Sequence, residues 1–182
     1  MKFGRLLARL FIGGMFIAHG TQKWFGWFGG GGVEGTTGTM SKLGLAPARA
    51  NAHAAAASET LGGAAIALGA FTPLAAASLI GTMITAIRTA HLKNGFWNTG
   101  GGYEFNLTII AALLLVVDGG PGPISVDGIL GTEETGAGAA LAALALGALG
   151  STVTLAAAKV AHQKAVAAAP AEPAEAEQPA AA

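Results

Sequence analysis

The residues best suited to chemistry gather near the ends of apolar segments. His19, Gln22 and Lys23 are spaced i, i+3 and i+4, so they share one face of a helix. The remaining candidates for a ligand-binding or proton-transfer cluster are Glu59, Arg88, His91, Tyr103 and Glu104. Such groups can donate hydrogen bonds to a ligand oxygen, and the carboxyl groups can also pass protons.

Five apolar segments must position these residues: about 5–25, 51–70, 73–92, 103–117 and 136–158. A membrane-spanning helix needs about 20 mostly apolar residues. The first three segments meet this length, the fourth is short, and the fifth is long but rich in alanine. Breaks fall at Phe71-Thr72-Pro73 and at the GGPGP run of residues 119–123.

The sequence therefore predicts an all-α membrane protein with a four-helix transmembrane bundle and a fifth, C-terminal transmembrane helix. The expected domains are 1–131 for the bundle, 132–160 for the additional Ala/Gly-rich helix and 161–182 for a disordered Pro/Ala/Glu tail. We interpret the N-terminal apolar run as a retained first helix, because Arg9 interrupts it and no clear cleavage site follows.

Composition supports the bilayer as solvent. Of the 182 residues, 52% are hydrophobic and only 11% are charged, about half the charged fraction of soluble domains. The net charge is zero and no basic block is present, so nothing favours nucleic-acid binding. Cysteine is absent, which removes thiolate metal sites and cysteine-ligated iron–sulfur clusters, and no metal site is expected.

An up-and-down arrangement of the helices brings the candidates together at one membrane face. We call the face at the N-terminus side A and the opposite face side B. All the candidates then lie in the side-B half, with Glu59 roughly 12 Å deep. A charge at the centre of a membrane costs about 2.5–3.5 kcal/mol, so we expect ion pairing. We predict Glu59 with Arg88 as the primary pair. The same cluster could equally serve only to hold the helices together.

The distribution of basic residues bears on orientation. Side B carries more lysine and arginine than side A if all five segments span, which favours a cytoplasmic side B. The basic N-terminus, with Lys2, Arg5 and Arg9, favours the opposite orientation.

Several motifs resemble the DoxX family of small membrane proteins. They are RLLARLFIGGMFIAHGTQKWFGWFGG, ETLGGAAIALGAFTPLAA, HLKNGFW, GGYEFNLTII and GPGPISVDGIL, which together cover about residues 4–131. The resemblance implies a multi-pass protein of the bacterial plasma membrane. It also implies a link to quinone-dependent sulfur oxidation, or to a redox complex with a sulfurtransferase and a superoxide dismutase.

Three functions are compatible with these features. The first is a subunit of a membrane oxidoreductase whose cluster binds a quinone and whose electrons come from a partner protein. The second is a non-enzymatic anchor that recruits soluble redox proteins, using the 25–50 loop and the acidic tail. The third is a small carrier of a solute or of protons, which would need to form a homo-oligomer.

Overall fold

The computed structural model describes residues 2–168, and this part of the chain is helical with short connections. The α-helices are α1 (Lys2–Phe25), α2 (Gly32–Lys42), α3 (Ala48–Leu68), α4 (Thr72–Ala86), α5 (Glu104–Gly119), α6 (Val126–Leu130) and α7 (Gly136–Ala168). Short 3₁₀ turns lie at Trp27–Gly29, Leu92–Asn94 and Asn98–Gly100. The predicted all-helical fold is confirmed.

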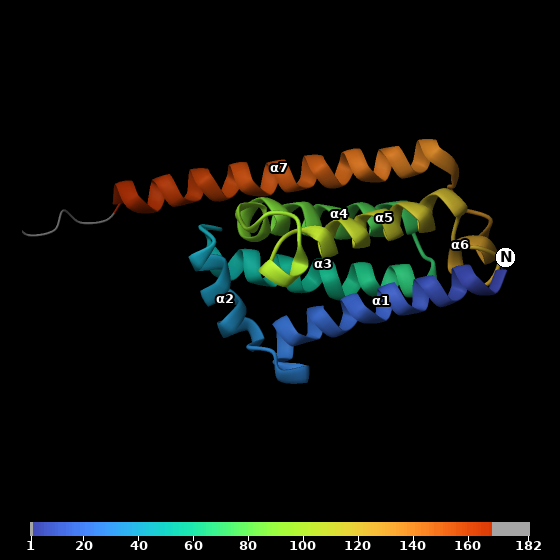
Figure 1. Cartoon of the computed structure of the whole chain (residues 1–182), viewed down its shortest axis with the longest axis horizontal. Helices are drawn as coiled ribbons and strands as arrows, with labels where there is room; N and C mark the ends of the chain where they lie inside the picture. The colour runs from blue at the N-terminus through green and yellow to red at the C-terminus, as the bar shows by residue number, and fades with distance from the viewer. Residues whose placement is uncertain (1, 169–182) are drawn as a thin grey trace, which may run out of the picture.

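The five long helices lie lengthwise beside one another (Figure 1). Helices α1, α4 and α7 run towards the end where α2 lies, and α3 and α5 run back towards α6. The α2 end corresponds to side B and the α6 end to side A. The predicted apolar segments correspond to α1, α3, α4, α5 and α7.

Two helix ends differ from the predicted ones. The α-helical geometry of α4 stops at Ala86, and a π-helical turn over Ile87–His91 carries the chain onward. Helix α7 continues to Ala168, so the expectation of disorder from residue 161 is wrong for 161–168. Those residues include Ala, Gln and Lys, which favour helix, and the next proline is Pro170. Residues 169–182 of the predicted tail lie outside the described part.

Two short helices were not predicted from the sequence. Helix α2 is rich in glycine and threonine, which are weak helix formers, but its side chains pack against α1 and α3. Its Thr36 and Thr37 hydroxyls each donate to the carbonyl four residues earlier. Helix α6 begins at a side-chain cap, in which Ser125 Oγ accepts from the Gly128 N–H at 2.9 Å.

Glycine allows the closest contacts between helices. A Cβ added to Gly63 of α3 would lie 2.7 Å from the Gly13 carbonyl oxygen of α1 and 2.8 Å from Phe16 Cβ. A Cβ added to Gly147 of α7 would lie 2.8 Å from the Ala77 carbonyl oxygen of α4. Close backbone approach of this kind drives helix association in membranes. It brings α1 onto α3, and α7 onto α4.

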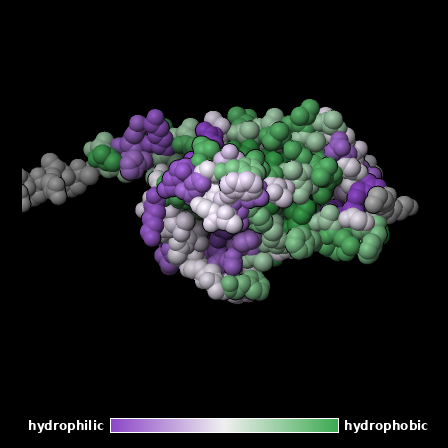
Figure 2. All heavy atoms as spheres, in the orientation of Figure 1, coloured by the Kyte–Doolittle hydropathy of each residue, from purple (hydrophilic) through white to green (hydrophobic). Residues whose placement is uncertain are grey.

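The surface is divided along the length of the molecule. In Figure 2, hydrophobic residues cover the middle of the visible face, and hydrophilic residues gather towards the two ends. Two helical segments in the described part are long and apolar enough to cross a membrane, Thr72–Asn94 with 23 residues and Gly136–Ala168 with 33. At about 1.5 Å per residue, α7 is about 50 Å long, which exceeds the hydrocarbon thickness of about 30 Å.

Candidate functional site

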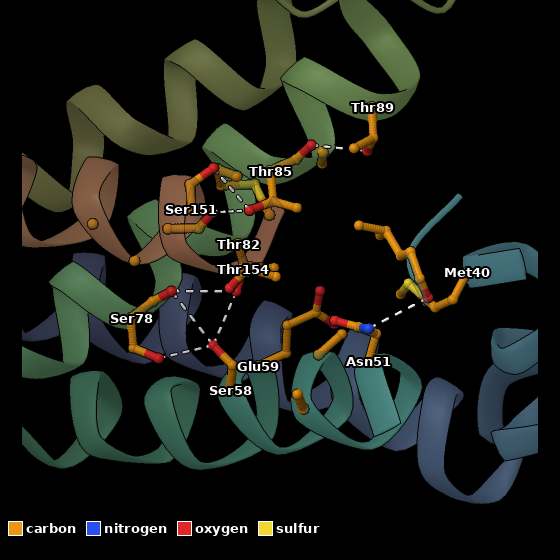
Figure 3. A pocket seen from close by; sticks show the side chains of 18 of the residues that line it. Met40, Asn51, Ser58, Glu59, Ser78, Thr82, Thr85, Thr89, Ser151 and Thr154 are labelled. Carbon is orange, nitrogen blue, oxygen red and sulfur yellow. Dashed lines mark hydrogen bonds between the residues drawn. The ribbon is translucent and has the colours of Figure 1, made fainter. Parts of the chain in front are cut away.

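A cavity of about 480 Å³ lies among α3, α4 and α7, with α2 and the segment after it along one side. This volume is in the range of small-molecule sites. Apolar side chains form much of the wall: Met40, Leu43, Leu45, Met83 and Leu146. Seven hydroxyl side chains also line it: Ser58, Ser78, Thr82, Thr85, Thr89, Ser151 and Thr154 (Figure 3). The mixture suits a mainly apolar ligand that carries a few polar atoms.

An ion pair stands at the wall of this cavity. Lys23 Nζ at the end of α1 lies 2.5 Å from Glu59 Oε2 on α3, and the two side chains are 25% and 6% exposed, respectively. Lys23 Nζ also lies 3.4 Å from the His19 carbonyl oxygen. An ammonium group has three protons, so Lys23 retains one for a further acceptor. Figure 3 shows the Glu59 side chain pointing from α3 into the cavity.

One group of hydroxyls joins α3 to α4. Ser58 Oγ lies 2.8 Å from Ser78 Oγ and 2.9 Å from Thr82 Oγ1. Thr82 also donates to the Ser78 carbonyl at 3.2 Å. These hydroxyls therefore satisfy one another and fix the register of the two helices beside Glu59.

A second contact joins α4 to α7. Thr85 Oγ1 lies 2.8 Å from the Gly81 carbonyl oxygen and 3.0 Å from Ser151 Oγ. Ser151 is 1% exposed, so this contact lies inside the protein. Thr154, one turn further along α7, also lines the cavity. Helix α7 thus contributes two hydroxyl side chains, Ser151 and Thr154, to the cavity wall.

The predicted pairing of Glu59 with Arg88 is wrong. Glu59 binds Lys23, because glycine contacts bring α1 directly against α3. Arg88 lies in the π-helical turn, is exposed, and donates from Nη1 to Thr152 Oγ1 of α7 at 3.1 Å. Of the eight residues predicted to cluster at side B, Lys23 and Glu59 line the cavity and the other six do not.

The other predicted residues organise the connections at side B. His19 is exposed, and Gln22 Nε2 donates to the Phe28 carbonyl at 3.3 Å. His91 Nδ1 lies 2.8 Å from the Gly101 carbonyl oxygen.

Tyr103 and Glu104 lie where the α4–α5 connection meets the start of α5. The Tyr103 ring meets Phe96 edge-on at a centroid distance of 5.7 Å. Glu104 Oε2 accepts from the Asn98 N–H at 3.0 Å. These contacts hold residues 92–103 in place, and none of these residues lines the cavity.

The hydroxyl wall was missed in the sequence, although a signal for it exists. Ser78, Thr82 and Thr85 recur at spacings of four and three residues, which places them on one face of α4. Ser151 and Thr154 are likewise three residues apart on α7. Both faces are therefore visible in the sequence as polar stripes within apolar segments.

A second polar group at side A was also missed. Asp127 of α6 accepts from the Phe71 N–H at 2.8 Å, the Thr72 N–H at 3.0 Å and the Thr72 hydroxyl at 2.7 Å. Arg9 is 1% exposed and donates from Nη2 to the Ile124 carbonyl at 2.6 Å. Asp127 thus ties α6 to the α3–α4 turn, and Arg9 ties α1 to the segment just before α6.

The hydrogen bonds determine the titration of Asp127, which lies outside the long helices. Burial raises the pKa of this carboxyl, but the bonds from Thr72 and Phe71, together with the Thr132 hydroxyl, outweigh burial. The net pKa lies below the ordinary value of about 3.9. The ionised form is the one that closes this end of the bundle.

Comparison with protein families gives a match to the N-terminal half of the chain, the half that contains the Lys23–Glu59 ion pair. The DoxX family model matches residues 4–92, which span α1 to α4. Residues 4–92 form a DoxX domain. The match includes Lys23, Glu59 and the hydroxyls of α3 and α4, whereas α7 lies outside it.

One relative of this DoxX protein is a protein of Haemophilus influenzae whose name is "Uncharacterized protein". The two are 28% identical over 127 residues, which is 69% of this chain and 82% of the relative. No solved structure matches the DoxX chain. The comparisons thus give a membrane family, and they assign no role to the residues of the cavity.

Proposed function

We propose that this DoxX protein is a subunit of a membrane-associated oxidoreductase system and binds the head group of a membrane quinone in the α3–α4–α7 cavity. The observation that supports this proposal is the Lys23–Glu59 pair at the wall of a mainly apolar cavity. A quinone head group needs hydrogen-bond donors at its oxygens and an apolar enclosure for its ring. The cavity supplies both.

The roles of the residues follow from their positions. The remaining N–H of the Lys23 ammonium group would donate a hydrogen bond to a ligand oxygen. This bond orients the ring and draws electron density towards that oxygen. Glu59 faces the same space and would carry a proton between the ligand and the side-B surface. Lys23 is partly exposed, so this ion pair connects the cavity to that surface.

Electrons would come from a partner protein. The chain has no cysteine, and the described residues contain no group of three His, Cys, Asp or Glu side chains placed to hold a metal. The resemblance to family members suggests soluble redox proteins, such as a sulfurtransferase or a superoxide dismutase, as partners at side B. We further propose a multi-pass topology in the bacterial plasma membrane, formed by α1, α3, α4, α5 and α7.

The decisive experiment uses two glycines of α7. Gly150 lines the cavity, and a Cβ added there would meet no atom within 4 Å. Gly150→Leu should therefore fill the cavity without disturbing the packing. Gly138 also has nothing within 4 Å of an added Cβ but does not line the cavity, so Gly138→Leu is the matched control.

The measurement is mass spectrometry of quinone retained after purification in mild detergent. Wild type and Gly138→Leu should retain quinone, whereas Gly150→Leu should lose most of it. Glu59→Gln should also retain less. Equal retention in the two leucine variants, or no quinone in the wild type, would overturn the proposal. Co-purification of a soluble protein without quinone would favour the anchor, and solute uptake by vesicles would favour the carrier.

A further inference from the structure

Among the cavity hydroxyls, Thr154 is distinguished by its free hydroxyl group. Thr82, Thr85 and Thr89 each donate to the carbonyl four residues earlier in α4, and Thr152 of α7 does the same. Thr154 makes no hydrogen bond to any residue in the described range 2–168, although it lines the cavity. Its hydroxyl is thus available to a ligand as donor and as acceptor.

The packing fixes the level of Thr154 along the bundle. Thr85 of α4 lies against Ser151 of α7. Because α4 and α7 run in the same direction (Figure 1), Thr154, three residues after Ser151, lies at about the level of Arg88, three residues after Thr85. On the other wall, Ser58 contacts Ser78 and Thr82, so it lies at about the level of residue 80. Because α3 runs opposite to α4 (Figure 1), the next residue of α3, Glu59, lies at about the level of residue 79. Nine residues, counted along α4 and the start of the π-helical turn, separate the two levels, which is roughly 13 Å at about 1.5 Å per residue.

The two side chains lean towards each other across this gap. A Cα–Cβ bond tilts towards the N-terminus of its own helix. Helices α3 and α7 run in opposite directions (Figure 1), so Glu59 leans towards side B and Thr154 leans away from it. A six-membered ring with an oxygen at each end, plus a hydrogen bond of about 2.8 Å on either side, fits a gap of this order.

We infer that Thr154 binds a second oxygen of the ligand, at the end of the ring opposite the Lys23–Glu59 pair, and so selects head groups with two opposed oxygens. The inference rests on the proposed function, because it concerns the same cavity. It makes α7, which lies outside the family match, the helix that sets ligand selectivity in this chain. Thr154 is a specificity-determining residue here and carries no proton-transfer step.

The test compares two probes, a short-chain 1,4-benzoquinone and the matching monophenol, whose ring has one oxygen. Binding is measured by titration calorimetry on the full chain in detergent. Wild type should prefer the quinone by about fivefold to tenfold, the effect of one hydrogen bond. Thr154→Val, which keeps the shape of the side chain, should abolish that preference and leave monophenol affinity unchanged.

The control is Thr152→Val, two residues away on the same helix and exposed. It should keep the wild-type preference. If wild type binds the quinone and Thr154→Val keeps the preference, or loses monophenol affinity as well, the inference about Thr154 is wrong and the proposed function stands. If wild type binds neither probe, the proposed function fails, and the inference fails with it.

Discussion

Removing either partner of the Lys23–Glu59 pair should destabilise the protein to different extents. Glu59 is 6% exposed as a side chain and Lys23 is 25% exposed. In Lys23→Met, the carboxylate would remain buried without its cation. In Glu59→Gln, the lysine would remain, and its long aliphatic stem allows the ammonium group to reach the membrane surface.

The expected magnitudes follow from this asymmetry. Leaving one charge of a buried pair uncompensated costs about 3–5 kcal/mol, and the lower end applies here because Lys23 is partly exposed. We therefore expect Lys23→Met to lower the free energy of unfolding by about 3 kcal/mol. A partly exposed pair contributes about 1 kcal/mol, so Glu59→Gln should cost about that amount. The double variant should be more stable than Lys23→Met alone, because no charge is then stranded.

The assay is equilibrium unfolding of the full chain in mixed detergent micelles, followed by helical circular dichroism for wild type, both single variants and the double variant. The cycle isolates the coupling between the two residues. Equal losses in the two single variants would refute the asymmetry. Additive losses in the double variant would show that the two groups do not interact.

Two further predictions concern packing and the side-A end. Gly63→Leu should clash with α1 and lower stability by about 3 kcal/mol. Gly14→Leu, with open space around its added Cβ, should change stability by less than about 0.5 kcal/mol. Thermal unfolding in detergent measures both variants, and similar losses would contradict the close contact of α1 with α3. Asp127→Asn should cost about 2–3 kcal/mol, because an amide group would replace an oxygen that accepts from Thr72. The pKa of Asp127 is lowered in the folded state, so the stability that its carboxylate contributes is present above about pH 4 and is lost as the pH falls through that lowered pKa. If wild type and Asp127→Asn lose stability equally as the pH falls, this prediction is wrong.

Much of the architecture could be predicted because the segments have clear physical limits. Apolar length and the breaks at Pro73 and at 119–123 located the five long helices. The up-and-down order of those helices was enough to place Lys23 and Glu59 at the same end. Both inferences depend on chain length and apolar pattern, which are properties of single segments.

The partner of Glu59 could not be predicted in the same way. Arg88 and Lys23 are both cations at side B, and the choice depends on which helix lies closest to α3. Gly13 and Gly63 decide it by allowing α1 to approach, and the π-helical turn leaves Arg88 facing Thr152. Neither the contact nor the turn has a signal in a single sequence.

The hydroxyl wall and α2 were missed for related reasons. In an apolar helix, serine and threonine resemble ordinary small packing residues, since their hydroxyls can bond to the carbonyl four residues earlier. Thr154 differs from Thr85 only through its surroundings in the folded chain. Helix α2 has a weak intrinsic preference for helix, and its helical form depends on contacts with α1 and α3.

Photolabelling can show whether the α3–α4–α7 cavity holds a quinone head group. A short-chain benzoquinone bearing an azide would be irradiated with the purified full chain in detergent, and the labelled peptides would be identified by mass spectrometry. We predict labels on residues 54–59, 77–89 and 146–154 that disappear with excess unlabelled quinone and in Gly150→Leu. Labels confined to the outer, lipid-facing residues, or labels that persist in Gly150→Leu, would show that the quinone does not bind in this cavity.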